Sequence, residues 1–270
     1  MTGLEHLVVQ DIFLTRTAQL ADVVLPAAAT LGEAEGTVTS SERRVQRVRK
    51  AYDAPGEARD DIEIVYELAR RLGHDLGSAR AEDVWSEVRS LSPWHAGMSY
   101  ERLEELGGIQ WPCAEESDAG ALFLHGRLWD DVVAERAPFQ VVEHDPPVDA
   151  LDDDFPLRLT TGRRLESYNT GVQTGGYSSP LHAGGTDILL SPVDGERYGV
   201  ADGGRVRIVS RRGAVETSAR YDPNLRAGLA FMNLHFPDEV ATNMLTIDAT
   251  DPKSGTAEFK ATAIRLEPVA

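Results

Sequence analysis

The chain has 270 residues, which suits one large domain or two modest ones, and 41% apolar with 26% charged residues predict an ordinary folded core. A formal net charge of −17 argues against general nucleic-acid binding. No apolar run reaches the roughly 18 residues of a membrane span and no signal-peptide pattern is present, so we expect a cytoplasmic protein.

Cys113 is the only cysteine in the sequence. An intrachain disulfide is therefore excluded, as is an iron–sulfur cluster or cysteine-rich zinc site held by this chain alone. We also find no phosphate-binding Walker loop, no G-x-S-x-G nucleophile turn and no metal-spaced histidines. We predict no catalytic residue and no metal ligand in this chain.

The N-terminal segment resembles the tail of a parallel α/β sheet. Residues 6–11 (HLVVQD) and 21–27 (ADVVLPA) have the apolar pattern of buried strands, and the stretch between them leaves room for one or two helical turns. So small a sheet cannot cover both of its faces, and its edges would be exposed. Either more chain once preceded this segment or a partner covers it.

The charges are unevenly distributed along the sequence. Residues 42–50 (ERRVQRVRK) are strongly basic, while residues 143–154 (EHDPPVDALDDD) are acidic and have the Pro-Pro composition of a linker. The basic run has two interpretations, a solvated face or a local contact with an anion or partner.

Three helices are predicted between these two segments. In residues 60–72 the apolar side chains of Ile62, Val65, Ala69 and Leu72 fall on one stripe, Asp60 or Asp61 can cap the start, and Gly73 suits the end. A second helix over 82–91 is expected to bury Val84, Trp85, Val88 and Leu91 and to stop at Ser92-Pro93. A third helix is expected over 99–106.

After the acidic segment the period changes to that of strands. Short β-rich runs cover 155–161, 187–191, 204–221 and 228–234, with a short helix that ends at Gly199 and a hairpin turn near Gly213. So many short strands would leave many edges, and a closed barrel would remove them.

One long segment between the strands has an unusual composition. Residues 168–187 (YNTGVQTGGYSSPLHAGGTD) contain five glycines and small polar side chains, with almost nothing that could fill a core. Short donors (Thr161, Ser167, Asn169, Thr170, Thr174) and two arginines (Arg163, Arg164) lie in it or just before it. These groups suit the binding of a polyanion, and the alternative is a mobile surface loop. We expect His182 and His235 to be hydrogen-bonding or surface residues, not metal ligands.

Several ordered motifs together resemble the C-terminal portion of the molybdopterin oxidoreductases, most of all the catalytic (alpha) subunits of formate dehydrogenases. The motifs cover nearly the whole chain and read VVQDIFLTRTAQLADVVLPAA, EGTVTSSERRVQRVRKA, PGEARDDIEIVYELARRLG, FPLRLTTGR, YNTG, YGVADGGRVRIVSRRG and NMLTIDATDPKSGTAEFK. By this resemblance the basic run belongs to an internal packing and cofactor-side segment.

The resemblance implies a split architecture. Residues 1–142 would be the C-terminal part of an α/β molybdopterin oxidoreductase domain, a partial doubly wound unit, and residues 143–154 a linker. Residues 155–270 would form a six-stranded double-psi β-barrel that binds molybdopterin guanine dinucleotide. The implied cofactor is bis(molybdopterin guanine dinucleotide) with molybdenum or tungsten.

The resemblance also implies the residues of a cofactor site. Those that would face one guanosine, the pterin and phosphates, or the other end of the cofactor are Gln10, Asp11, Thr15, Thr161, Gly162, Arg163, Ser167, Tyr168, Asn169, Thr170, Asn243, Phe259 and Lys260. Ser167 and Asn169 stand where many formate dehydrogenases have histidines.

The family's cluster-binding cysteines, metal ligand and adjacent histidine and arginine lie upstream of the matching region, and nothing in this chain matches them. The resemblance therefore implies an N-terminal half or subunit that carries the Fe–S cluster and the metal ligand. The leading interpretation is the cofactor-binding part of a formate dehydrogenase-type oxidoreductase, inactive when isolated. The alternatives are a non-catalytic module that carries or assembles the cofactor, and a degenerate fragment that binds nothing.

Overall fold

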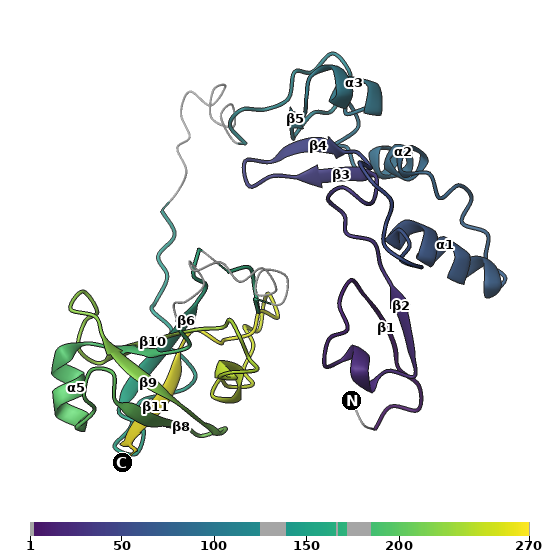
Figure 1. The fold of residues 1–270 in the computed structure, drawn as a ribbon. Helices are drawn as coiled ribbons and strands as arrows, with labels where there is room; N and C mark the ends of the chain where they lie inside the picture. The colour runs from purple at the N-terminus through teal and green to yellow at the C-terminus, as the bar shows by residue number, and fades with distance from the viewer. Residues whose placement is uncertain (1–2, 125–138, 166, 172–184, 270) are drawn as a thin grey trace. The chain divides into compact units, whose positions relative to one another are not determined.

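The computed structural model describes residues 3–124, 139–165, 167–171 and 185–269. The chain divides into two compact units, Met1–Phe139 and Gln140–Ala270, which are described separately here (Figure 1). The division falls near the acidic segment, and the exact domain bounds remain a prediction. Within the described ranges, no helix is both long enough and apolar enough to cross a membrane.

The first unit begins with a two-stranded parallel sheet. Strands β1 (Val8–Asp11) and β2 (Val23–Pro26) pair in parallel, and the 3-10 turn η1 (Ala18–Leu20) lies between them. The predicted parallel pair is confirmed, but the prediction that its strands are buried is wrong within this chain. Val8, Val23 and Val24 are 47%, 40% and 37% exposed. The turn η1 contacts β1, but much of the apolar surface of the two strands stays exposed in the described part of the chain.

The basic run folds as an antiparallel hairpin, which the sequence analysis did not predict. Strand β3 (Gly36–Thr39) pairs with β4 (Arg44–Val48), and β4 pairs with the short β5 (Ile109–Gln110). Arg47 forms ion pairs with Glu35 and Glu104, and Arg49 with Glu104. Arg47 and Arg49 are thus matched by acids of the same unit, and Arg43 bonds the carbonyls of Trp111, Ala121 and Leu122, which supports the interpretation of this run as a packing segment.

All three predicted helices are present within one or two residues of their expected ends. They are α1 (Asp61–Arg71), α2 (Ala81–Leu91) and α3 (Tyr100–Glu105). The carboxylate of Asp60 caps α1 by accepting from the Ile62 amide at 2.8 Å, and Ser99 caps α3 through the Arg102 amide at 3.2 Å. These caps satisfy amides that the first turn of a helix leaves without partners.

The predicted apolar stripes of α1 and α2 are only partly buried. Ile64 is the buried residue of α1, while Val65 and Leu72 are 50% and 68% exposed. On α2 only Trp85 is buried, and Val88 and Leu91 are 40% and 76% exposed. The expected burial along α2 therefore holds for Trp85, which packs in a core with Val45 and Met98, and not for Val88 and Leu91.

The second unit is a closed six-stranded barrel, as predicted. Its strands are β6 (Leu157–Gly162), β7 (Ile188–Leu190), β8 (Arg205–Ser210), β9 (Ala214–Tyr221), β10 (Leu229–Asn233) and β11 (Thr262–Pro268). They follow the order β10-β6-β11-β8-β9-β7, with β6–β10 and β7–β9 parallel and the other pairs antiparallel.

The barrel follows directly from the alternation of its strands. In β6 Leu157, Leu159 and Thr161 point inward while the residues between them are partly exposed, and β8 alternates in the same way. The inward side chains form one core (Leu157, Leu159, Ile188, Leu190, Val206, Ile208, Ala219, Ala230, Met232, Leu245, Ile264). The predicted helix is α5 (Pro192–Tyr198), and Gly199 ends it with φ of 68°, a left-handed conformation that glycine adopts without strain.

Part of the acidic segment is bound to the barrel. The buried carboxylate of Asp149 accepts from the Ala263 amide at 2.7 Å and pairs with Arg211, while the Arg158 guanidinium donates to the Asp149 carbonyl at 2.6 Å. Burial lowers the pKa of the Arg158 guanidinium, and the nearby charges of Asp149 and Glu258 oppose that shift. Residues from Asp149 onward therefore belong structurally to the second unit.

Candidate functional site

Three of the predicted site residues meet at the C-terminal end of β6. The Thr161 hydroxyl donates to the Phe259 carbonyl at 2.9 Å, and the Lys260 ammonium donates to the Thr161 carbonyl at 2.9 Å. The ammonium also lies 5.4 Å from the centre of the Phe259 ring. Thr161 is buried and its hydroxyl proton is already donated, so its role is to join β6 to the segment at Phe259. Lys260 is exposed, and its ammonium keeps further N–H donors for a ligand.

The loop after β6 is joined to the segment that follows β10. The Leu234 amide donates to the Gly162 carbonyl at 3.3 Å, and the Phe236 amide donates to the Thr170 carbonyl at 2.8 Å. The His235 ring contacts the Arg164 amide and the Asn169 carbonyl. Three carbonyl oxygens of the loop are thus bound within the barrel unit, which removes groups that would repel an anion.

The two arginines of the loop have different surroundings. Arg163 is exposed, and its side chain has no hydrogen-bond or ion-pair partner among the residues that the structure describes. Arg164 is half-buried and lines a cavity of about 290 Å³ with Asp187, Arg220 and Asn233. Arg220 forms an ion pair with Asp187 at 3.4 Å. Arg163 and Lys260 are therefore the two side chains near the end of β6 with charge to offer an anion.

The glycines of this loop have a packing role. A Cβ atom on Gly162 would lie 2.8 Å from the Phe231 ring, and one on Gly171 would lie 2.7 Å from the Phe236 ring. Gly171 also has φ of 83°. Close packing alone explains both positions, so neither glycine is evidence of a ligand.

The remaining predicted residues divide between the two units. Ser167 is buried, Tyr168 is exposed, and Asn243 is an exposed residue of the 3-10 turn η3 (Thr242–Met244). Thr174 and His182, which the sequence analysis singled out, lie outside the described residues.

In the first unit, the predicted guanosine-facing residues lie at and just after the end of β1. The Gln10 amide donates to Asp61 at the start of α1, and the Asp11 carboxylate accepts from the Phe13 amide at 2.9 Å. Thr15 accepts from the Ala18 amide at 3.2 Å. These bonds hold the strand-end turn in shape, and each of the three side chains keeps further hydrogen-bonding capacity for a ligand.

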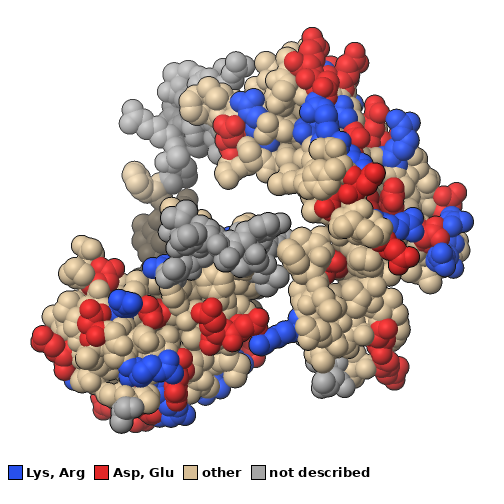
Figure 2. All heavy atoms as spheres, viewed as in Figure 1, with Lys and Arg blue, Asp and Glu red and all other residues tan. Residues whose placement is uncertain are grey.

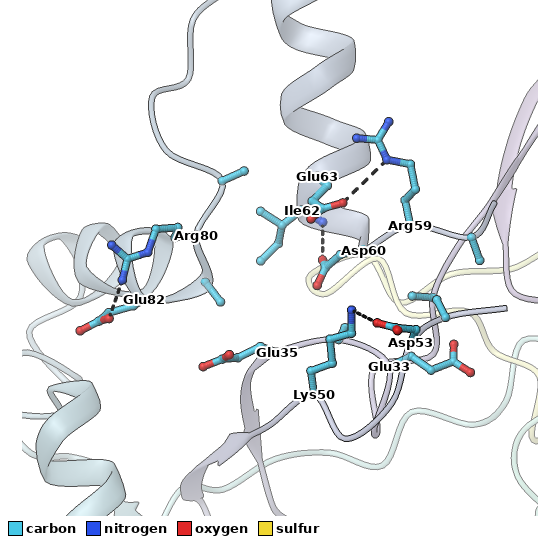
Figure 3. Close-up of a pocket in the computed structure, with 16 residues that line it drawn as sticks. Glu33, Glu35, Lys50, Asp53, Arg59, Asp60, Ile62, Glu63, Arg80 and Glu82 are labelled. Carbon is cyan, nitrogen blue, oxygen red and sulfur yellow. Dashed lines mark hydrogen bonds and ion pairs between the residues drawn. The ribbon is translucent and has the colours of Figure 1, made fainter. Parts of the chain in front are cut away.

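One cavity of the first unit contains none of the predicted site residues. It has a volume of about 620 Å³ and is lined by charged residues that pair with one another or cap α1 (Figure 3). Lys50 pairs with Asp53 at 2.8 Å, and Arg80 bonds Glu82 at 3.2 Å. With its basic groups paired, this cavity suits an anionic cofactor poorly. The described part of the chain contains no group of three or more His, Cys, Asp and Glu residues arranged to hold a metal ion.

Two family models match the chain. Residues 2–71 match the model described as molybdopterin oxidoreductase, and residues 157–263 match the one described as Molydopterin dinucleotide binding domain. The chain is also 42% identical over 274 residues to the F420-dependent formate dehydrogenase 2 subunit alpha of Methanococcus maripaludis. This chain belongs to the molybdopterin oxidoreductase family.

Other family members match the chain over the same region. Formate dehydrogenase H of Escherichia coli is 33% identical over 276 residues, and the assimilatory nitrate reductase catalytic subunit of Bacillus subtilis is 35% identical over 272 residues. The alignments include 96–100% of this chain but only 38–40% of each of the three relatives. The chain thus spans about two fifths of the length of these relatives.

A solved structure shows the same fold. The acetylene hydratase from Pelobacter acetylenicus matches with a TM-score of 0.64 over 97% of this chain and 40% of its own, at 19% sequence identity. The predicted combination of an α/β segment with a β-barrel is therefore confirmed, and the acetylene hydratase shares it.

The residues at the end of β6 suit a diphosphate-containing cofactor of this family. The guanidinium of Arg163, which has no partner among the described residues, and the exposed ammonium of Lys260 supply positive charge, and the carbonyls of Gly162, Asn169 and Thr170 are bound elsewhere. Sequence reasoning missed His235 as the residue that organises this loop. A single histidine in a polar run carries no periodic or spacing signal, and only the fold brings it beside residues 164–169.

Proposed function

We propose that this chain is the cofactor-binding C-terminal part of a bis(molybdopterin guanine dinucleotide) oxidoreductase of formate dehydrogenase type. The cofactor would carry molybdenum or tungsten and supply the redox chemistry, while this chain binds and orients it. An upstream or partner half would provide the Fe–S cluster and the metal ligand. A cytoplasmic location is part of the same proposal.

The observation that carries the proposal is the arrangement at the end of β6. Arg163 is exposed and has no partner in the described ranges of the chain, and Lys260 is held by the Thr161 carbonyl at 2.9 Å. Converging cationic donors stabilise phosphate oxygens through charge-assisted hydrogen bonds. In our proposal Arg163 and Lys260 bind phosphate or pterin oxygens, and Tyr168, Asn169 and Thr170 complete the loop's contact.

The exposed apolar surface of the first unit supports the need for a further half. Ile12, Phe13, Leu14 and Leu20 lie exposed around the β1–β2 sheet, and Figure 2 shows few charged side chains over it. Two-stranded parallel sheets need cover on both faces. Because the relatives are much longer than this chain, we propose that the further half covers this sheet and the exposed stripe of α1.

The substrate assignment is tested by activity in the reconstituted assembly. We expect the chain together with its further half to oxidise formate with an artificial electron acceptor. Nitrate reduction is the comparison assay, because nitrate reductases are among the relatives. Nitrate reduction without formate oxidation would overturn the formate assignment.

The isolated chain is expected to give no redox turnover in either assay, since we assign it neither metal ligand nor electron-carrying cluster. Formate oxidation by the isolated chain would overturn the split of functions. A role as a cofactor-carrying or assembly module is the alternative, and no feature of the structure favours it.

A further inference from the structure

The loop after β6 is held in shape by one buried side chain. His235 is 1% exposed and follows β10 directly, and both of its ring nitrogens are bonded to the loop. The Arg164 amide donates to Nε2 at 2.7 Å, and Nδ1 contacts the Asn169 carbonyl. One residue therefore connects loop positions 164 and 169, which lie next to the predicted binding residues Arg163 and Thr170.

These two contacts determine the tautomer of the ring. An amide N–H can only donate, so Nε2 must accept, and a carbonyl can only accept, so Nδ1 must carry the proton. The ring is thus a neutral bridge with one acceptor and one donor. Its own amide donates to the Asn233 side chain at 3.0 Å, which in turn donates to the Gly185 carbonyl at 3.1 Å. The bridge is therefore anchored to the end of β10.

We propose that His235 is a positioning residue for the cofactor loop. It holds the backbone at residues 164 and 169 so that Arg163 and the side chains of residues 168–170 are presented to the cofactor together. The backbone bonds of residues 234 and 236 to Gly162 and Thr170 lie on either side of it. Asn169 adopts φ of 49°, an uncommon conformation for a residue other than glycine, and the bridge to its carbonyl helps to hold it there. The proposal rests on the proposed function, because it assigns this loop to the cofactor.

The test compares two variants whose side chains have nearly the same length. In His235→Gln the side-chain amide supplies one acceptor and one donor, so it can replace both bonds of the ring. In His235→Met it supplies neither. The control is Thr242→Val, which removes the nearby buried bond from the Thr242 hydroxyl to the Asn233 carbonyl at 2.8 Å without touching the loop.

Two measurements are made on the full chain assembled with its further half. Amide hydrogen exchange of Arg164 reports the bridge itself, and pterin content per chain after gel filtration reports cofactor retention. For His235→Met we expect faster exchange at Arg164 and roughly tenfold weaker cofactor retention, as the loss of two buried bonds implies. We expect His235→Gln to keep most of the exchange protection at Arg164 and most of the cofactor retention. Thr242→Val should change neither the exchange nor the retention.

The outcomes separate this proposal from the proposed function. Unchanged exchange in a folded His235→Met variant would overturn the bridge, and altered exchange with unchanged pterin content would overturn its positioning role. If His235→Met does not fold, His235→Gln decides: near-normal exchange and retention support the proposal, and loss of either contradicts it. Absence of pterin from the wild-type assembly would overturn the proposed function and the cofactor role of His235 together, whatever the exchange shows.

Discussion

Arg163 and Arg164 are adjacent in sequence but differ in what surrounds them. Side chains of neighbouring residues in an extended segment point to opposite sides. The structure places Arg163 in the open without a partner among the described residues, and Arg164 half-buried at a cavity wall. The two residues therefore provide a matched pair for testing the predicted phosphate contact.

We expect Arg163→Ala to weaken cofactor retention in the reconstituted assembly about tenfold or more, since a desolvated charge-assisted bond contributes roughly 1.5–3 kcal/mol. The melting temperature of the cofactor-free chain should barely change, because Arg163 has no partner in the described structure. Pterin content after gel filtration measures the first effect and thermal unfolding the second.

Arg164→Ala is the control for this prediction. The amide of residue 164 and its bond to His235 survive the substitution, so the loop keeps its shape. We expect a much smaller loss of cofactor than for Arg163→Ala. Equal losses in the two variants, or no loss in either, would contradict the assignment of Arg163.

Asp149 is the residue that attaches the acidic segment to the barrel. Its buried carboxylate accepts from the Ala263 amide and pairs with Arg211. Asp149→Ala leaves a buried amide and a guanidinium without this partner, and we expect a loss of roughly 2–4 kcal/mol in the free energy of unfolding. Urea unfolding of the full chain measures the change.

The neighbouring acid provides the control for Asp149. Asp153 is exposed and has no hydrogen bond or ion pair in the described structure, so Asp153→Ala should change stability by less than about 0.5 kcal/mol. A similar effect of the two substitutions would mean that loss of negative charge, and not the buried contact, is responsible.

At the scale of the elements, the sequence predicted what its own periodicity determines. The alternation of β6 and β8 and the caps of α1 and α5 are local features, and the structure has them where they were expected. Strand β4 was not predicted as a strand. The spacing of its arginines suits an exposed basic face equally well. Only contacts distant in sequence, such as Arg47 with Glu104, show that this run is paired within the fold.

The stripes of α1 and α2 were misjudged for a different reason. Periodicity identifies an apolar face but does not say which chain covers it. Val65, Leu72 and Leu91 are exposed in the described part of the chain although they lie on apolar stripes. Prediction of the candidate site from sequence has the same limit. Thr161, Phe259 and Lys260 could be matched by resemblance, but only the folded structure shows that they contact one another.

The segment between the units is the place where proteolysis should act first. Residues 140–146 are exposed, whereas Asp149 is buried against the barrel. We expect limited proteolysis to cut on the N-terminal side of Asp149 and to release a stable barrel fragment, detected by mass spectrometry. Preferred cutting within residues 200–235 would contradict the closed barrel, because that stretch contains β8, β9 and β10.

At the scale of the whole molecule, two features indicate an assembly larger than this chain. The relatives extend well beyond the matched region, and the first unit exposes apolar side chains on a sheet and two helices. Burial of apolar side chains such as these is the main stabilising contribution to a permanent interface. In our proposal, a further half completes the cofactor site to which this chain contributes.

The most direct test of the account is metal and pterin analysis of the chain purified together with its further half. We predict molybdenum or tungsten in a stoichiometry of about one metal to two released guanine dinucleotides, as a bis-dinucleotide cofactor requires. The metal would be measured by mass spectrometry and the pterin by fluorescence after oxidation. A well-folded assembly that contains neither metal nor pterin would contradict the proposal that this chain binds the cofactor.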